Sequence, residues 1–387
     1  MLAFVEYYLP GYTAGGPIRT ISNLVDQIGE HVRFTIVTRH SDPRDPGPYE
    51  GIQTDRMVPL GRAQVYYASP ARLSVRGMRA LLCELEHDVL YLNSLTSPRF
   101  TLLPLLLRYL RLVPRRPVVL APRGELDPGA LAIGSSKKRL FLGVSRFVGL
   151  YRGVIWQATN EQEGVYIRRW FGDDVRVENV ANLPAHHLLS LAERPRKEAG
   201  RLRICFISRL ARKKNLDGAL RMLQAVSGGE VVFDIYGSRE DPAYWSECEA
   251  LISQLPSNVA AAYRGALHHE RVRDVMGQYD LFFFPTHGEN FGHVIAEALS
   301  AGCPVLISDR TPWRDLARRH VGWDVSLDHP DNFREVLEKC IRMDETEMAK
   351  WRTGAQAHIR ALIEDGEATR QSRFLFERAV SAAAVGG

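Results

Sequence analysis

Short apolar runs alternate with longer amphipathic stretches along the whole 387-residue chain. The runs are apolar at nearly every position, which is typical of parallel strands covered by helices on both faces of a sheet. They are also too short for buried helices, so the pattern predicts an α/β fold of repeated strand–helix units. The runs are "FTIVT" (34–38), "DVLYLN" (88–93), "PVVLAP" (117–122), "GVIWQAT" (153–159), "RICFIS" (203–208), "VVFDIYG" (231–237), "LFFFPT" (281–286) and "PVLIS" (304–308).

The length predicts two domains, because a chain this long exceeds one ordinary core. The alternation falters over about 185–201, where "AHHLLSLAERPRKEAGR" is charged and contains Pro195 and Gly200. We expect the interdomain linker there. The predicted domains are residues 1–190 and 198–367, with a cleft between them, and the segment after residue 348 is expected to form two helices broken near Gly366.

Composition narrows the class of partner and the compartment. A net charge of +5 favours anionic small molecules or an anionic membrane surface, without the charge density of a dedicated nucleic-acid binder. The five cysteines form no CxxC, so we expect neither a disulfide framework nor a zinc site. Free cysteines indicate a reducing compartment, and we expect the cytoplasm. "MLAFVEYYLPGY" does not match a signal peptide, and we expect the mature chain to begin there. "TLLPLLLRYLRL" (101–112) is too short to span a bilayer.

The stretch "PTHGENFGHVIAEALSAGCPVLISD" (285–309) carries the first candidate site. It predicts a loop at the carboxyl end of a strand, followed by a helix, and ligands of parallel sheets collect at that edge. Gly292 permits close approach, and the free N–H groups near Phe291 to Val294 would bind an anion. Glu289 and Glu297 would then flank a diphosphate and bind hydroxyls, since a carboxylate accepts two hydrogen bonds from a vicinal diol. Alternatively, both are surface acids near a helix N-terminus.

A second candidate loop is "ISRLARKKNLDGAL" (207–220), directly after the first strand of the second half. Arg209, Lys213 and Lys214 lie there, at the same sheet edge as Glu289. Such cations would neutralise a diphosphate and stabilise the charge that grows on a leaving phosphate. The alternative is a solvated basic loop.

Two loops of the first half are further candidates. In "YLPGYTAGGPIRTISNLV" (8–25), Gly15-Gly16 precede a predicted helix and permit a phosphate or sugar to approach, or they simply turn the chain. In "APRGELDPGALAIGSSKKRLF" (121–141), Arg123, Glu125 and Asp127 would orient an acceptor. The basic run 137–139 is either a solvated helix face or, with "RYLRLVPRRP" (108–117), a surface that lies on anionic lipid.

Together these motifs, with "NLP" at Asn182, resemble the retaining glycosyltransferases of family 4. The resemblance runs over nearly the whole chain, and its most specific part is the E-x7-E spacing of Glu289 and Glu297. It implies the GT-B fold, in which two Rossmann-like domains face each other across a cleft. It also implies a C-terminal helix, about 368–387, that crosses back to the N-terminal domain.

The resemblance also implies roles for single residues. Arg209 and Lys214 would clamp the diphosphate and Glu289 would contact the donor sugar, and these three are the predicted catalytic residues. Donor contacts would come from Glu297 on the ribose, from the backbone of Asn290, Phe291 and Gly292, and from Gly15 and Gly16 on the N-terminal side.

The chain departs from the family pattern on the acceptor side. Many members carry a His where this chain has Arg123, and the usual Pro-Asn of the linker-proximal turn is Ala181-Asn182. We assign the acceptor side to Arg123 and Asp127. "SDRTPWRDL" (308–316) resembles the members that build bacterial surface polysaccharides.

The predicted function is therefore a retaining hexosyltransferase that needs neither metal nor cofactor. The donor would be a UDP- or GDP-sugar, the acceptor a glycan or lipid-linked oligosaccharide, and nucleic acid is not an expected partner. The expected location is the cytoplasm, including the inner face of the cytoplasmic membrane. The alternatives are a nucleotide-sugar epimerase or hydrolase on the same fold, and a non-catalytic sugar-nucleotide-binding protein.

Overall fold

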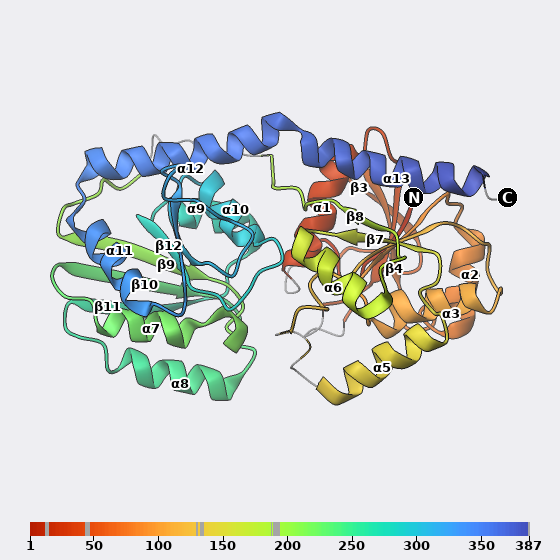
Figure 1. Ribbon diagram of the computed structural model, residues 1–387, viewed down its shortest axis with the longest axis horizontal. Helices are drawn as coiled ribbons and strands as arrows, with labels where there is room; N and C mark the ends of the chain where they lie inside the picture. Colours follow the sequence, from red (N-terminus) through yellow and green to blue (C-terminus); the bar gives the residue numbers. More distant parts are fainter. Residues whose placement is uncertain are drawn as a thin grey trace. The chain divides into compact units, whose positions relative to one another are not determined.

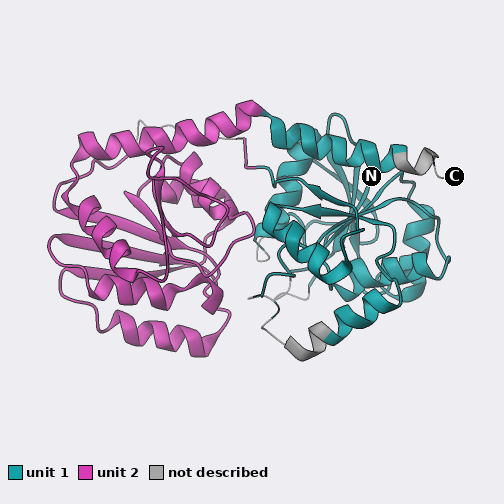
Figure 2. Ribbon diagram, in the orientation of Figure 1, with its two compact units in different colours: residues 1–183, 366–387 teal, residues 184–365 magenta. Residues whose placement is uncertain are grey.

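The computed structural model describes residues 1–11, 15–42, 47–128, 131, 135–186, 188 and 194–385, with only the backbone at 135–139 and 382–385. It divides into two compact units, each with its own sheet (Figure 2). The first unit comprises Met1–Leu183 and Gly366–Gly387, and the second comprises Pro184–Asp365. The apolar runs predicted an α/β fold and the family resemblance implied two Rossmann-like domains, so the fold class is confirmed.

The first unit contains an eight-stranded sheet in the order β3-β4-β2-β1-β5-β6-β7-β8. Its strands pair in parallel except at one edge, where β3 runs antiparallel to β4. The sequence reasoning expected parallel strands and missed this edge, because β3 is only four residues long, MVPL, and contains Pro59, which weakens its strand signal. The strands are β1 (Leu2–Phe4), β2 (Phe34–Arg39), β3 (Met57–Leu60), β4 (Ala63–Ala68), β5 (Leu90–Asn93), β6 (Val118–Ala121), β7 (Val154–Ala158) and β8 (Val177–Asn179).

Helices cover both faces of this sheet (Figure 1). Side chains alternate between the two cores, as strand geometry requires: Leu92 packs on one face and its neighbour Tyr91 on the other. The helical segments are α1 (Gly16–Ile28), α2 (Val75–Glu84), η1 (Pro98–Leu102), α3 (Leu103–Tyr109), α5 (Ser135–Phe147), α6 (Glu161–Phe171) and α13 (Glu367–Val385).

The C-terminal segment forms two helices, as predicted, and they end in different units. α12 (Glu345–Asp365) lies in the second unit and α13 in the first, with Gly366 between them at φ 62°. The ring of Phe376 on α13 lies 5.1 Å from that of Tyr91 in the first core. The expected return of the C-terminal helix to the N-terminal domain is confirmed.

The second unit contains a fully parallel six-stranded sheet in the order β11-β10-β9-β12-β13-β14. Its strands are β9 (Arg201–Ile207), β10 (Glu230–Tyr236), β11 (Val259–Gly265), β12 (Leu281–Phe284), β13 (Val305–Ser308) and β14 (Gly322–Val325). Its other helical segments are η2 (Arg212–Lys214), α7 (Leu216–Gln224), α8 (Pro242–Ile252), α9 (His269–Met276), α10 (His293–Ser300) and α11 (Pro330–Arg342).

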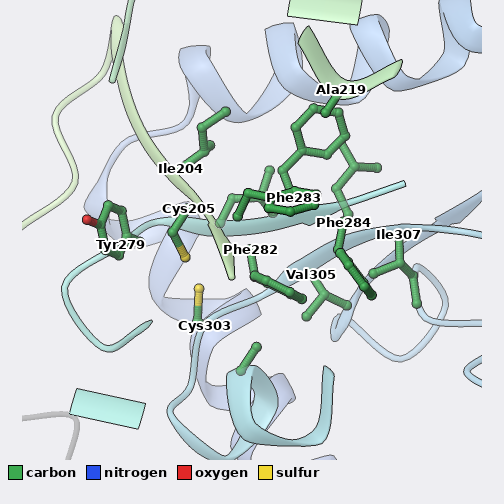
Figure 3. Packing of buried hydrophobic residues seen from close by; sticks show 14 of the residues in the cluster. Ile204, Cys205, Ala219, Tyr279, Phe282, Phe283, Phe284, Cys303, Val305 and Ile307 are labelled. Atoms are coloured by element: carbon green, nitrogen blue, oxygen red, sulfur yellow. The ribbon is translucent and has the colours of Figure 1, made fainter. Parts of the chain in front are cut away.

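The core of the second unit includes β12, the strand that precedes one of the two candidate loops. β12 is buried along its length, and Figure 3 shows the Phe282 and Phe284 side chains packed among neighbouring strands. The sulfur atoms of Cys205 and Cys303 point toward one another there (Figure 3). All five cysteines are free thiols. The central strand is therefore fixed on both faces, which gives the loop after it a rigid base.

The end of the expected linker packs on the second unit. Lys197 is 4% exposed, and its ammonium donates to the carbonyl oxygens of Glu198, Ile341 and Met343. Arg194 donates to the carbonyl oxygen of Gly302 at 2.8 Å. Across the described residues, no helix is both long and apolar enough to cross a membrane.

Candidate functional site

The two loops predicted to carry the site follow adjacent strands. β9 and β12 pair directly in the middle of the second sheet, so the loops 208–215 and 285–292 leave the same edge side by side. In a parallel sheet this edge is the carboxyl end of every strand, where ligands bind. The topology therefore brings together candidates that lie far apart in sequence.

Lys214 and Glu289 form an ion pair across these loops. The Lys214 ammonium donates to Glu289 Oε1, and the two side chains are 16% and 14% exposed. The ammonium also lies 5.6 Å from the centre of the Phe284 ring. Two predicted catalytic residues thus share one largely enclosed position, where electrostatic interactions are stronger than in bulk water.

Hydrogen bonds fix the register of the two loops. The carbonyl oxygen of Lys213 accepts from the His287 N–H at 2.9 Å and from Thr286 Oγ1 at 3.1 Å. Asn215 Nδ2 donates to the carbonyl oxygen of Pro285 at 2.7 Å. Asn215 has a left-handed backbone at φ 61°, which Asn tolerates better than most residues. Sequence reasoning did not single out Thr286 or Asn215, although an Asn before a predicted helix was a usable signal.

The loop after β12 ends at the predicted helix start. Gly292 has φ 80° and precedes α10, and a Cβ there would lie 2.8 Å from Ile295 Cδ1. The positive φ therefore favours glycine at this position, whereas Ile295 Cδ1 is the end of a flexible side chain. Trp313 Nε1 donates to the Phe291 carbonyl oxygen at 2.6 Å, and the Phe291 ring lies 4.8 Å from that of His293. These contacts hold the backbone that the sequence assigns to the donor.

The remaining candidates of this loop are Glu297 and Asn290. Glu297 lies in α10, one turn beyond its start, and is half-buried. Asn290 is half-buried in the loop beside Glu289. Both acids of the E-x7-E spacing therefore belong to the segment that surrounds one helix N-terminus, a favourable place for an anion.

Arg209 lies on the other side of the β9 loop, next to the end of β10. Its guanidinium pairs with Glu240 at 3.4 Å and is 52% exposed. The backbone is crowded there, because a Cβ on Gly237 would lie 1.7 Å from the Ser208 carbonyl oxygen. The two predicted clamp cations thus border the β9 loop on opposite sides, one half-exposed and one enclosed.

In the first unit, Gly15 and Gly16 mark the start of α1, after β1. Gly15 has φ 64° and ψ −117°, angles that favour glycine, and a Cβ there would meet no atom of the described residues within 4 Å. Pro17 follows in the first helical turn, where its missing N–H costs no helical hydrogen bond.

Arg123, predicted to face an acceptor, makes contacts within its own unit. Its guanidinium donates to Asn93 Oδ1 at 2.6 Å, to Asn182 Oδ1 at 2.7 Å and to the Tyr91 hydroxyl at 2.5 Å. Burial raises the pKa of Tyr91, and the nearby Arg123 charge acts in the opposite direction. Arg123, one departure from the family pattern, is therefore in direct contact with Asn182, which follows the other departure at Ala181.

Two further acids at this edge accept hydrogen bonds from backbone N–H groups. Glu125 accepts from Ser94 Oγ at 2.5 Å and from the N–H groups of Leu95 at 3.0 Å and Thr96 at 3.1 Å. Glu163 is 3% exposed and accepts from the N–H groups of Gly124 and Thr159.

Sequence reasoning missed Glu163. The available signal was the capping-box spacing, because Glu163 lies three residues after Asn160, the N-cap of α6. Its carboxylate, however, bonds to the N–H groups of Gly124 and Thr159. Asp127 is half-buried, and its N–H donates to the Gly124 carbonyl oxygen. The side chains of the basic run 137–139 lie outside the described residues.

No three His, Cys, Asp or Glu side chains gather in a way that could hold a metal ion, as far as the described ranges extend.

Two Rossmann-like units, with a C-terminal helix that returns to the first, define a protein of the GT-B fold. Solved structures share this architecture over nearly their whole length. Sucrose-phosphate synthase from Thermosynechococcus elongatus is 15% identical with a TM-score of 0.69, and the alignment covers 98% of this chain and 99% of that one. HepE of Anabaena, solved with UDP and glucose, is 15% identical with a TM-score of 0.66 over 98% and 99% of the two chains.

WaaG, a glycosyltransferase involved in lipopolysaccharide biosynthesis, is 14% identical with a TM-score of 0.65 over 97% and 99%. At these identities the likeness shows the fold alone. Residues 191–358 match the family model described as "Glycosyl transferases group 1". The matched segment covers most of the second unit and less than half of the chain. No curated protein matches the sequence.

Proposed function

We propose that this protein is a retaining glycosyltransferase that moves a hexose from a nucleoside-diphosphate sugar to a glycan or lipid-linked oligosaccharide. The observation that carries the proposal is the ion pair of Lys214 with Glu289 on two hydrogen-bonded loops at one sheet edge. The family match of residues 191–358 supports it, because the match includes both loops. HepE was solved with UDP-glucose, which favours a uridine donor here over a guanosine donor.

The proposed chemistry places positive charge where negative charge develops. The bond between the anomeric carbon and the phosphate oxygen breaks, and the acceptor oxygen bonds to the same face of that carbon. The leaving phosphate takes the proton of the acceptor hydroxyl. Lys214 and Arg209 stabilise the charge that grows on the diphosphate, the work that a divalent metal would otherwise do. Glu289 positions the sugar and forms no covalent bond to it.

The other donor contacts follow from their places in the fold. The start of α10, with the backbone of Asn290, Phe291 and Gly292, faces the diphosphate, and Glu297 binds the ribose hydroxyls. Gly15 and Gly16 give the donor a second backbone approach. Arg123 and Asp127 serve the acceptor side, Arg123 by holding the loops that surround it. We further propose a role in cell-surface polysaccharide synthesis in the cytoplasm, and the free cysteines fit a reducing compartment.

The test first removes the positive charge of Lys214 and then also removes the negative charge of Glu289, so that the pair is again neutral. Lys214→Met should lower kcat by about 100- to 1000-fold, the cost of losing one preorganised charge-stabilising group. Arg212→Met is the matched control, because Arg212 is a cation of the same turn that pairs instead with Glu247 of α8. Transfer is measured with a panel of UDP- and GDP-sugars, and donor binding by the rise in melting temperature.

The double variant Lys214→Met/Glu289→Gln separates function from structure. If the pair only stabilises the loops, restoring neutrality recovers both stability and transfer. The proposed function requires that transfer stays lost while stability recovers. Nucleotide release without acceptor at the rate of transfer would instead support a hydrolase, and donor binding without turnover would support a binding protein.

A further inference from the structure

One surface of the first unit combines exposed apolar side chains with a strong excess of positive charge. It comprises α3 with the residues that follow it to Arg116, and α5 with the turn that follows it to Arg152; we call it the α3–α5 surface. Arg108 Nη1 donates to the Arg152 carbonyl oxygen at 3.3 Å, which joins the two segments. In Figure 1, α5 lies at the lower border of this unit.

α5 presents apolar residues to the core and to solvent at once. Leu142 is 1% exposed and packs in the core. On the opposite face Leu140 is 70% exposed, Val144 52% and Phe147 92%. The spacing of these three residues, four and then three apart, places them in one stripe of the helix. A Phe left this exposed forfeits roughly 1.5–3 kcal/mol of burial, so the stripe is an unusual feature for a surface that faces only water.

α3 continues the apolar surface. Leu106, Tyr109 and Leu110 are all at least 44% exposed, while Leu105 and Leu107 are buried. Leu112, just beyond the helix, is 44% exposed. The two segments therefore contribute a shared set of large apolar side chains rather than scattered single residues.

The sequence segments that contain these side chains carry charge of one sign. Residues 89–124 and 128–160 together contain eleven Lys and Arg and no Asp or Glu. The rest of the chain holds the other 39 Lys and Arg against all 45 Asp and Glu, so the basic excess of the protein resides in these two segments. Arg111, Arg115 and Arg146 are exposed among the apolar residues.

We propose that the α3–α5 surface lies on an anionic lipid bilayer, with Leu140, Val144 and Phe147 entering the headgroup boundary. Helices that lie in the membrane plane combine an apolar face with flanking Lys and Arg in this way, and each cation near an anionic bilayer contributes about 1 kcal/mol. A second copy of the chain fits poorly, since two such faces would bring like charges together. A nucleic acid would neutralise the arginines but leave the aliphatic stripe in water.

The test measures binding to vesicles without any nucleotide sugar, so it does not rest on the proposed function, and either can fail alone. The protein should float with phosphatidylcholine vesicles that contain about one-third phosphatidylglycerol, and much less with pure phosphatidylcholine. Binding should weaken as salt rises, because salt screens the arginines.

Two variants assign the binding to this surface. Leu140→Ser/Phe147→Ser should weaken binding at least about tenfold without changing the melting temperature, because both side chains are already exposed. Arg111→Gln/Arg115→Gln should reduce it about 30-fold on anionic vesicles only, since two cations are lost. The control is Val165→Ser, an exposed apolar residue on α6 outside both segments.

Three results would overturn the proposal. The first is no flotation of the wild-type protein with anionic vesicles. The second is equal binding by wild type and the Leu140→Ser/Phe147→Ser variant, which would indicate general attraction to polyanions. The third is a dimeric wild type that this variant converts to a monomer, which would assign the surface to self-association.

Discussion

The carboxyl edges of the two sheets both carry charged side chains, but they use them differently. In the second unit, Lys214 and Glu289 meet across two loops whose register is fixed by other groups, and Arg209 is half-exposed. In the first unit, Arg123 and Glu125 are themselves the groups that fix the strand ends. Other groups thus hold the loops of the second edge, which fits the proposed donor site there, whereas charge at the first edge maintains the shape of the loops.

The largest expected loss of stability comes from Asn215, an uncharged residue that joins the two loops of the second edge. Asn215→Ala removes a hydrogen bond to a buried carbonyl oxygen and leaves Ala in a left-handed conformation, costs of about 1–3 and 1–2 kcal/mol. We expect unfolding in urea to show a loss of about 2–4 kcal/mol, with weaker donor binding.

The matched variant is Asn215→Gly, which tolerates the left-handed backbone and loses only the hydrogen bond. It should lie between Asn215→Ala and the wild type. If the Ala variant is as stable as the wild type, the loops are held by Lys214 and Glu289 after all, and the contrast between the two edges disappears.

A smaller loss of stability is expected when Arg123, at the first edge, is replaced by the other basic residue, lysine. Arg123→Lys keeps the positive charge but cannot reach Tyr91, Asn93 and Asn182 together, because a lysine has no planar fork of donors. The free energy of unfolding should fall by about 2 kcal/mol. Full stability combined with a raised KM for the acceptor alone would show that Arg123 binds the acceptor directly.

The smallest effect is expected at Tyr91. Tyr91→Phe removes the hydroxyl that Arg123 and Gln157 contact, but Asn93 and Asn182 still hold the guanidinium. A loss of about 1 kcal/mol is expected in thermal denaturation. In the double variant with Arg123→Lys the two losses should be less than additive, because they remove one shared contact. Strict additivity would place Tyr91 outside the network.

The sequence predicted the second edge better than the first, for a physical reason. Strands such as β9 and β12 are continuous apolar runs, and the rule that parallel strands share a carboxyl edge brings Lys214 to Glu289 without knowledge of side-chain positions. Their roles as donor ligands remain predictions. Arg123 was predicted from its loop alone, and its partners Asn93 and Asn182 lie 30 and 59 residues away. No local pattern encodes such a contact.

The edge hairpin of the first sheet was missed for a similar reason. β3 has only four residues, MVPL, and contains Pro59, so its strand signal is weak. Its pairing with β4 depends on a position at the border of the sheet. The exposed stripe of α5 escaped notice because periodicity shows which residues share a helix face, not which face meets the core.

The position of Gly366 has a consequence for how the protein can be divided. The chain leaves the first unit after Leu183 and re-enters it at Gly366, so one domain is nested in the sequence of the other. Leu375, Phe376 and Ala379 complete the core beside α1 and Tyr91. A truncation at Asp365 would thus leave the inserted domain whole and deprive its host of core residues. During synthesis the host domain therefore cannot complete its core until the whole inserted domain and α13 have been translated.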